Sequence, residues 1–151
     1  MARELKIWLY DRQQVIAKLT ALGGEHLNDT SSIHTYFNQP DGQVLKLVEM
    51  NGAITLDILK RQGKNFVIVS QEPVENQAAM LEKLKNQYGI KTKLTMHSKS
   101  YQLQGYKIGL YDIENVGEFL ILTGDNPTVE LLDKWFAIKL PKVVTVSFDN
   151  L

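Results

Sequence analysis

The sequence lacks cysteine altogether, and this absence removes several kinds of chemistry at once. Without a thiol there is no disulfide framework, no thiolate zinc site and no cysteine nucleophile. The chain also lacks any apolar run approaching the roughly 20 residues that a helix needs to cross a bilayer. We therefore expect a cytoplasmic protein with no membrane partner.

Neither sign of charge is in excess, because Lys plus Arg and Asp plus Glu both number 17. A balanced chain creates no general field that attracts nucleic acid, and the basic-aromatic pattern of a nucleic-acid surface is missing too. The sequence contains no glycine-rich phosphate loop, and no motif places a serine, a histidine and an acid as a catalytic triad. Any charged site must therefore be local.

What the sequence does contain is a succession of short segments in which apolar and polar residues alternate, a pattern that predicts strands. We expect strands at residues 4–10, 32–37, 43–50, 53–61, 65–70, 91–103, 106–113 and 118–123. Helices are predicted at 12–19, 75–88 and 129–138. Asp11 should cap the first helix with Gln14 as its capping-box partner, and Asn126-Pro127 should open the third. Asn51-Gly52 predicts a tight hairpin.

About eight strands with short loops and a few helices between them favour a closed or nearly closed antiparallel β-barrel of the α+β class. Closure removes the bare edges that strands otherwise expose. A two-layer α+β sandwich is the alternative architecture. Because 151 residues is the size of one ordinary domain, we expect residues 1–151 to form a single domain.

Five segments, in order along the chain, match known sequence motifs. Glu4-Leu5-Lys6 resembles the end of E-x-E-x-K, and Thr35-Tyr36-Phe37 with residues 42–49 resembles D-T-Y-F and G-R-L-K-L-R-E. Residues 56–61 resemble a strand ending in Y-x-R, residues 106–119 resemble R-I-H-L-D-E-V-E-G-L-G-x-F, and residues 147–151 resemble S-Y-x-D-L-L. Together these segments resemble the CYTH family, within it the class IV adenylyl cyclases.

The resemblance implies a triphosphate-tunnel barrel. In that family inward arginines and lysines bind the triphosphate, while inward carboxylates hold a divalent metal. Polyphosphate needs cations around it, and Mg²⁺ or Mn²⁺ prefers hard carboxylate oxygens. Both kinds of charge must therefore face one cavity.

Several motif positions carry other residues in this chain. Val48 stands where the family has an arginine, and Met96 and Ser98 stand where it has a pair of cations. His34 and Tyr111 each replace an aspartate of a motif. Ile121 and Thr123 replace two glutamates. The family's first glutamate falls on Ala2, so Glu4 is the only acid that matches a motif. A magnesium ion usually needs one or two carboxylates besides substrate oxygens and water. We therefore expect no metal site and no cofactor.

The candidate tunnel residues are those that match a motif or share the inward parity of the strands. They are Glu4, Lys6, Lys46, Asp57, Arg61, Tyr101, Lys107 and Tyr111. A plainer interpretation of Glu4 and Lys6 is an internal ion pair, and of the two tyrosines a barrel-filling role. The apolar replacements, with Trp8 and Leu59 at inward parity, would make the rest of the lining apolar.

Our first hypothesis is a catalytically degenerate CYTH-like barrel that binds a small ligand or serves as an interaction module. A mixed lining suits a ligand with an apolar body and one acidic group. The alternative is an enzyme with a reduced site, either a Mg²⁺- or Mn²⁺-dependent class IV adenylyl cyclase or a triphosphatase. The sequence leaves open whether any catalysis survives and whether the protein forms a homodimer.

Overall fold

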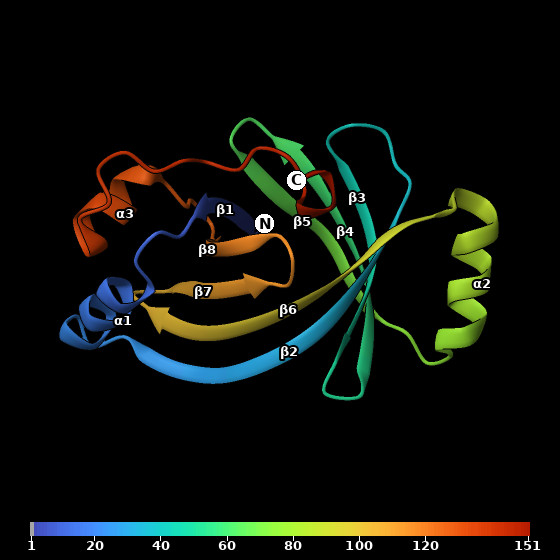
Figure 1. Ribbon diagram of the computed structural model, residues 1–151, viewed down its shortest axis with the longest axis horizontal. Coiled ribbons are helices and arrows are strands. Elements are labelled where there is room, and N and C mark those ends of the chain that lie inside the picture. The colour runs from blue at the N-terminus through green and yellow to red at the C-terminus, as the bar shows by residue number, and fades with distance from the viewer. Residues whose placement is uncertain (1) are drawn as a thin grey trace.

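The computed structural model describes residues 2–151, which form eight strands, three α-helices and a 3₁₀ turn (Figure 1). The strands are β1 (Arg3–Trp8), β2 (Glu25–Phe37), β3 (Gln43–Met50), β4 (Ala53–Gln62), β5 (Asn65–Pro73), β6 (Ile90–Leu103), β7 (Tyr106–Ile113) and β8 (Gly117–Gly124). The helices are α1 (Arg12–Ala21), α2 (Gln77–Tyr88) and α3 (Val129–Phe136), and the 3₁₀ turn is Phe148–Asn150.

All eight strands close into one antiparallel barrel in the order β1-β5-β4-β3-β2-β6-β7-β8. Strand β1 completes the ring: six of its residues pair with β8, but only Arg3 and Glu4 pair with β5. The closed antiparallel barrel predicted from the sequence is therefore confirmed, and the two-layer sandwich is wrong. The hairpin at Asn51-Gly52 is also confirmed, because φ is positive at both residues (53° and 77°), as a tight two-residue turn requires.

Element boundaries differ from the prediction mainly where the residues are polar. Strand β2 begins at Glu25 instead of residue 32, because its first half pairs with β6 and is largely exposed, so it shows little apolar alternation. The side chain of Asp11 caps α1 as predicted, accepting from the amide of Gln14 at 3.1 Å. Helix α3 is capped by Thr128 and not by Asn126, since the Thr128 hydroxyl accepts from the amide of Leu131.

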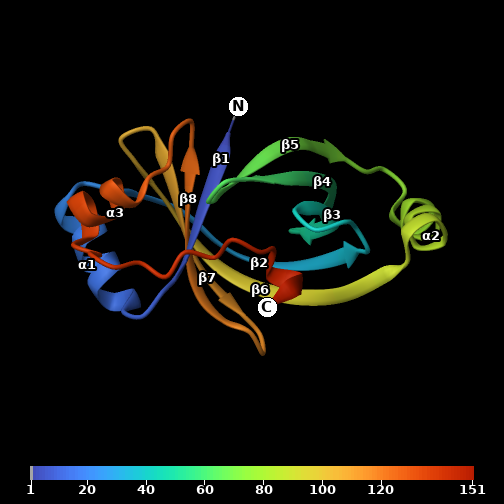
Figure 2. The same cartoon turned by 90° about the horizontal axis from the view of Figure 1, so that it is seen from above.

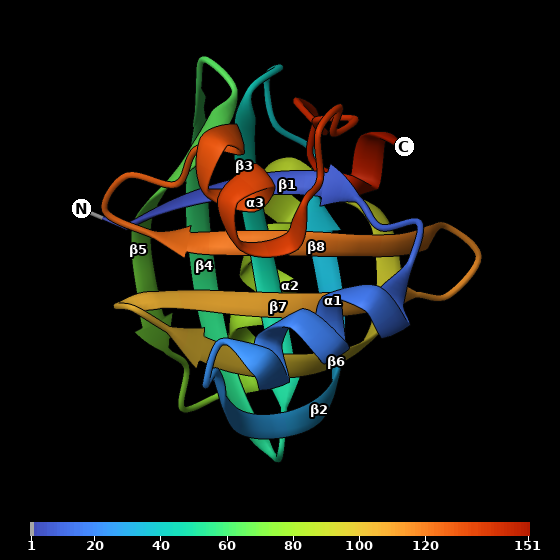
Figure 3. The ribbon, with the colours of Figure 1, turned by 90° about the vertical axis from the view of Figure 1, so that its left-hand side faces the viewer.

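Helices α1 and α3 cover the outer face of β1, β6, β7 and β8 (Figure 3). Leu5 and Ile7 of β1 point outward into this layer and pack with residues of the helices such as Leu19, Trp135 and Phe136. Successive side chains of a strand point to opposite faces, so the neighbouring residues Glu4, Lys6 and Trp8 face the interior.

Helix α2 lies at the opposite end of the molecule from α1 and α3 (Figures 1 and 2). Leu84 of α2 packs with Phe37, Leu45 and Leu47 in a cluster of its own. No helix within residues 2–151 is long and apolar enough to span a membrane.

Candidate functional site

The barrel interior gathers charged side chains from strands that are far apart in the sequence. Glu4 and Lys6 come from β1, Lys46 from β3 and Asp57 from β4. The register places Tyr36 opposite Lys46, and Lys46 opposite Asp57, so these three residues form one row across β2, β3 and β4. Cross-strand partners point to the same face, which here is the inside.

Lys6 is 4 % exposed, and its ammonium is only loosely paired. Its Nζ lies 3.9 Å from Oε1 of Glu4, and it stands over the rings of Phe66 and Phe148 at 4.1 and 4.4 Å from their centroids. Burial, which disfavours the charged form, lowers the pKa of Lys6 to about 8, although Glu4 partly offsets this effect. The site therefore holds a cation that lacks a close carboxylate.

Lys46 provides a second ammonium in the same interior. Its Nζ lies 5.3 Å from the centroid of the Tyr36 ring and makes no ion pair or hydrogen bond with any residue in the described chain. Burial lowers the pKa of Lys46, while Glu4 and Asp57 act in the opposite direction. Lys46 in turn lowers the pKa of Lys6, so the two ammonium groups repel each other. An anion between them would relieve that repulsion.

His34 lies beside the two lysines and has one nitrogen to spare. It is 8 % exposed, its Nε2 forms a hydrogen bond with Oγ of Ser32 at 2.9 Å, and its Nδ1 has no partner. Burial, followed by the charges of Lys46 and Lys6, lowers the pKa of His34 to about 2, so the imidazole is neutral. The neutral ring carries one N–H, and the Ser32 hydroxyl can either accept it or donate to the other nitrogen, so Nδ1 is free to bind a ligand as a donor or as an acceptor.

Three further polar groups of the interior are an acid and two phenols. Asp57 is 6 % exposed; its Oδ2 accepts from Nε2 of Gln71 at 3.3 Å, and its Oδ1 has no partner. Burial raises the pKa of Tyr36 well above its ordinary value, and burial followed by the charge of Glu4 raises the pKa of Tyr111. Both phenols therefore stay protonated and are donors.

Three predicted tunnel residues lie elsewhere. Tyr101 packs in the outer cluster beneath the helices, 5.1 Å from the ring of His26, because strand alternation from the inward Met96 puts position 101 on the outer face. Lys107 shares the inward parity of β7 opposite Thr123 but is exposed, because it lies near the start of the strand at the barrel end. Arg61 is tied to the carboxylate of Asp41 at 2.7 Å and to the carbonyl oxygen of Thr145 at 3.2 Å.

The C-terminal tail fills the barrel on the side where β1 and β5 barely pair. The amide of Val144 donates to the carbonyl of Lys6, and the amide of Trp8 donates to the carbonyl of Lys142, so the tail continues the sheet along β1. Val144, Val146 and Phe148 join the interior cluster, where the ring of Phe148 lies 4.7 Å from that of Phe119. The tail thus supplies part of the interior core.

The tail is fastened at its end by Asp149. Its Oδ2 lies 3.0 Å from Nζ of Lys91, while its Oδ1 is buried without a partner. The carboxylate also raises the pKa of Lys6 and Lys46, so it contributes negative charge to the same interior. Motif matching noted Asp149 in the closing S-Y-x-D-L-L segment but did not assign it to the site.

Sequence reasoning missed Tyr36, His34 and Phe148 as interior residues. Parity could have found the first two, because residues 34 and 36 share a face with each other and lie opposite Val48 and Lys46. The local sequence pattern does not predict that Phe148 enters the barrel, because its segment does not form a hairpin with a strand that neighbours it in the sequence.

The residues present do not fit a divalent-metal site. In the described part of the chain no group of three or more histidine, aspartate or glutamate side chains converges closely enough to hold a metal ion. Glu4 and Asp57 share the interior with two ammonium groups, whose positive charge opposes the binding of a further cation there.

Comparisons with known proteins support the fold and go no further. No family model matches the sequence, and no curated protein is similar to it in sequence. The PH1012 protein from Pyrococcus horikoshii has a similar structure, with a TM-score of 0.86 and 16 % identity, covering 100 % of this chain and 99 % of its own.

Two structures with named activities share the fold more distantly. A candidate adenylate cyclase from Vibrio parahaemolyticus has a TM-score of 0.67 at 12 % identity, covering 90 % of this chain and 82 % of its own. A candidate adenylyl cyclase from Hippeastrum has a TM-score of 0.61 at 12 % identity, and the match covers 89 % of this chain and 83 % of the Hippeastrum chain. That protein is described as having a dominant triphosphatase activity. The chain therefore has a CYTH-like barrel fold.

Proposed function

We propose that the barrel interior binds a small ligand with one acidic group and an apolar body, without metal-dependent phosphoryl chemistry. The observation that carries this proposal is the pair of buried ammonium groups, Lys6 and Lys46, beside the free Nδ1 of His34. Two ammonium groups with no carboxylate oxygen within hydrogen-bond distance in an apolar surrounding favour an anion, because charge-assisted hydrogen bonds are strongest where water is excluded.

The rest of the lining supports an apolar body for the ligand. Phe66, Met96, Phe119 and Ile121 are buried in the interior cluster, and Trp8 packs against them. Small-molecule sites are mostly apolar with a few placed polar groups, and this interior has that composition. Inorganic triphosphate, with charge along its whole length, is poorly matched to it.

Ligand binding in this barrel requires the tail to move. Val144, Val146 and Phe148 occupy the interior together with the strand residues. Apolar contacts made by the tail can be exchanged for contacts with an apolar ligand of similar volume at little cost, because volume-conserving apolar replacements disturb a core least.

Calorimetric titration tests the proposal with octanoate as the apolar acid and with tripolyphosphate and ATP as the polyphosphates. We expect octanoate to bind without metal, and Lys46→Met to weaken binding at least about tenfold by removing a charge-assisted contact. Lys60→Met, on the exposed face of β4, is the matched control and should bind as the unaltered protein does. The absence of heat with octanoate would contradict the proposal and leave an interaction module acting through its outer surface.

The second candidate function is a divalent-metal-dependent adenylyl cyclase or triphosphatase with a reduced site of Glu4, Lys6, Lys46, Asp57 and Arg61. The likeness to the cyclase and triphosphatase structures favours it. Its test is turnover of ATP or tripolyphosphate with Mn²⁺ that a chelator abolishes and Glu4→Ala removes. Turnover of this kind would replace the first proposal.

A further inference from the structure

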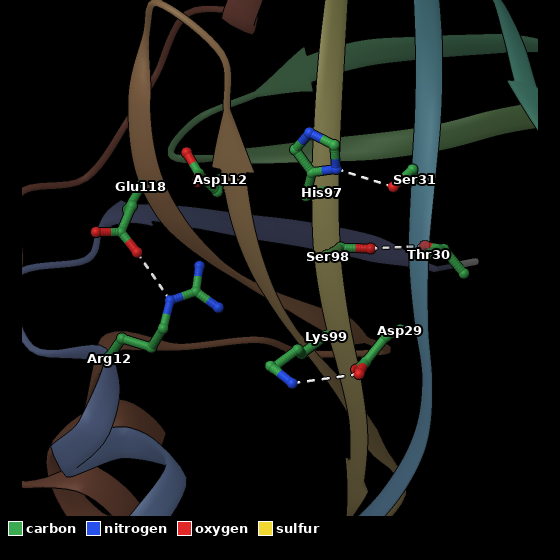
Figure 4. A pocket seen from close by; sticks show the side chains of 9 residues that line it. All are labelled: Arg12, Asp29, Thr30, Ser31, His97, Ser98, Lys99, Asp112 and Glu118. Carbon is green, nitrogen blue, oxygen red and sulfur yellow. Dashed lines mark hydrogen bonds and ion pairs between the residues drawn. The ribbon is translucent and has the colours of Figure 1, made fainter.

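A polar groove lies on the outer surface of the barrel, apart from the interior (Figure 4). It has a volume of about 340 Å³ and is bounded by the beginning of α1 and by strands β2, β6, β7 and β8. The residues that line it are all of polar or charged type: Arg12, Asp29, Thr30, Ser31, His97, Ser98, Lys99, Asp112 and Glu118. We propose that this groove carries a serine-histidine-glutamate centre that transfers acyl groups from small carboxylic esters.

The nucleophile and its base are Ser31 and His97, which are direct cross-strand partners on β2 and β6. Oγ of Ser31 lies 2.8 Å from Nδ1 of His97, as the dashed line in Figure 4 shows. Both side chains are exposed, so a substrate in the groove can reach them. A hydroxyl within hydrogen-bond reach of an imidazole is the arrangement that activates a serine.

Glu114, in the turn between β7 and β8, stands on the far side of the imidazole. Its Oε1 lies 3.7 Å from Nε2 of His97. A carboxylate at this nitrogen favours the tautomer with the proton on Nε2, which leaves Nδ1 free to accept the Ser31 proton. At 3.7 Å this contact is longer than a hydrogen bond, and catalytic hydrogen bonds often form fully only when substrate binds. Glu114 is thus a positioning residue for His97.

Arg12 supplies positive charge to the same groove. Its Nε donates to Oε1 of Glu118 at 2.8 Å, and its two terminal nitrogens make no hydrogen bond within residues 2–151. Arg12 lies across the groove from Ser31 (Figure 4), because Glu118 is three strands away from Ser31 in the register, so the guanidinium contributes positive potential to the groove and does not contact the reacting carbonyl. Because the groove is open to solvent, we expect it to act on small activated esters.

The reaction proceeds in two balanced halves. Oγ of Ser31 attacks the carbonyl carbon while its proton passes to Nδ1 of His97; the ester C–O bond then breaks, and His97 returns the proton to the departing alkoxide. Water attacks the acyl-serine, gives a proton to His97 and releases the carboxylic acid, and the returned proton restores the Ser31 hydroxyl. No oxidant, metal or further reactant is needed.

Hydrolysis of p-nitrophenyl acetate by the full-length protein tests the proposal. We expect Ser31→Ala and His97→Ala each to lower the rate by about 100-fold, the usual contribution of a positioned base and its nucleophile. The matched control is His26→Ala, which removes an exposed histidine outside the groove lining. This variant should keep the full rate.

Labelling identifies the reacting atom independently of the rate. A fluorophosphonate should modify Ser31, as located by mass spectrometry of peptides, and His97→Ala should prevent the modification. Equal hydrolysis by the unaltered protein and Ser31→Ala, or modification of a different serine, would overturn the proposal.

The role of Glu114 is tested separately. Glu114→Gln should lower kcat with KM unchanged, and Glu114→Asp should restore part of kcat, because only the aspartate returns a charge to Nε2 of His97. Equal kcat in the glutamine and aspartate variants would overturn the positioning role.

Discussion

At the scale of single residues, the unusual feature is a pair of lysines held inside a β-barrel without close counter-ions. Removing an ammonium group from water is costly, and Lys6 recovers only part of that cost from Glu4 at 3.9 Å and from two aromatic rings. A buried lysine whose pKa is lowered in this way is a candidate for ligand binding.

Lys6 should make the stability of the protein depend on pH above neutrality. Its pKa is about 8 in the folded state and 10.5 in the unfolded chain, so between these values the unfolded chain binds the proton more tightly. The free energy of unfolding should therefore rise with pH in this window, by about 1.4 kcal/mol per pH unit at most. Lys6 contributes least to the free energy of unfolding below pH 8. There its side chain is charged in both the folded and the unfolded state, and the folded state bears the full cost of burying that charge.

Urea titrations at pH 7.5 and 9.5 measure this effect, with Lys6→Met as the comparison. We expect the stability of the unaltered protein to gain on the order of 2 kcal/mol relative to Lys6→Met across this range. The upper limit stays below the ordinary pKa of tyrosine, because Tyr36 and Tyr111 act in the opposite direction at higher pH. If the difference in the free energy of unfolding between the two proteins were the same at both pH values, Lys6 would not be buried as a cation.

At the scale of elements, the C-terminal tail has two attachments of different kinds. Its backbone pairs with β1 through Lys142 and Val144, and its end is fastened to β6 by the ion pair of Lys91 with Asp149. The short pairing of β1 with β5 leaves β1 with free backbone groups, and the tail satisfies them. The tail therefore acts as a partial ninth strand.

Lys91→Met should loosen the tail without unfolding the barrel. Loss of a partly buried ion pair worth about 1 kcal/mol should speed hydrogen exchange of the Val144 amide by several-fold. Lys93→Met is the matched control, because Lys93 lies on the same strand, is exposed and makes no ion pair in the described residues. Unchanged exchange at Val144 in Lys91→Met would mean that apolar packing alone holds the tail.

At the scale of the whole molecule, the barrel is completed by its own side chains. Three clusters divide the core: one beneath α1 and α3, one inside the barrel and one beneath α2. The interior cluster includes aromatic side chains from β1, β5, β8 and the tail, so the fold does not depend on a bound ligand to fill its centre. Homodimerisation stays a prediction, as does the organisation of residues 1–151 as a single domain.

Divalent metal should leave the stability of the whole protein unchanged. Adding Mn²⁺ or Mg²⁺ should shift Tm by less than about 1 °C, whereas a ligand at 100 times its Kd stabilises by about 2.7 kcal/mol and raises Tm by several degrees. Thermal melts followed by circular dichroism, with chelator and with each metal, make the comparison. A rise in Tm that Glu4→Ala abolishes would support the metal-dependent alternative.

The closed-barrel architecture of this protein follows largely from its amino-acid sequence. Strand alternation and turn residues are local properties, so the succession of strands along the chain, the Asn51-Gly52 hairpin and the cap at Asp11 could be predicted. Motif matching and parity also identified Glu4, Lys6, Lys46, Asp57 and Tyr111, which the structure brings to one interior.

Tertiary structure decided the rest, because those features depend on contacts between distant segments. Tyr101 packs in the outer cluster beneath α1 and α3, and the ion pair with Asp41 holds Arg61 at the rim. The insertion of Phe148 and the alignment of Ser31 with His97 depend on the closure of the barrel. A local pattern states which face a side chain prefers, but only the closed sheet determines which other residues share that face.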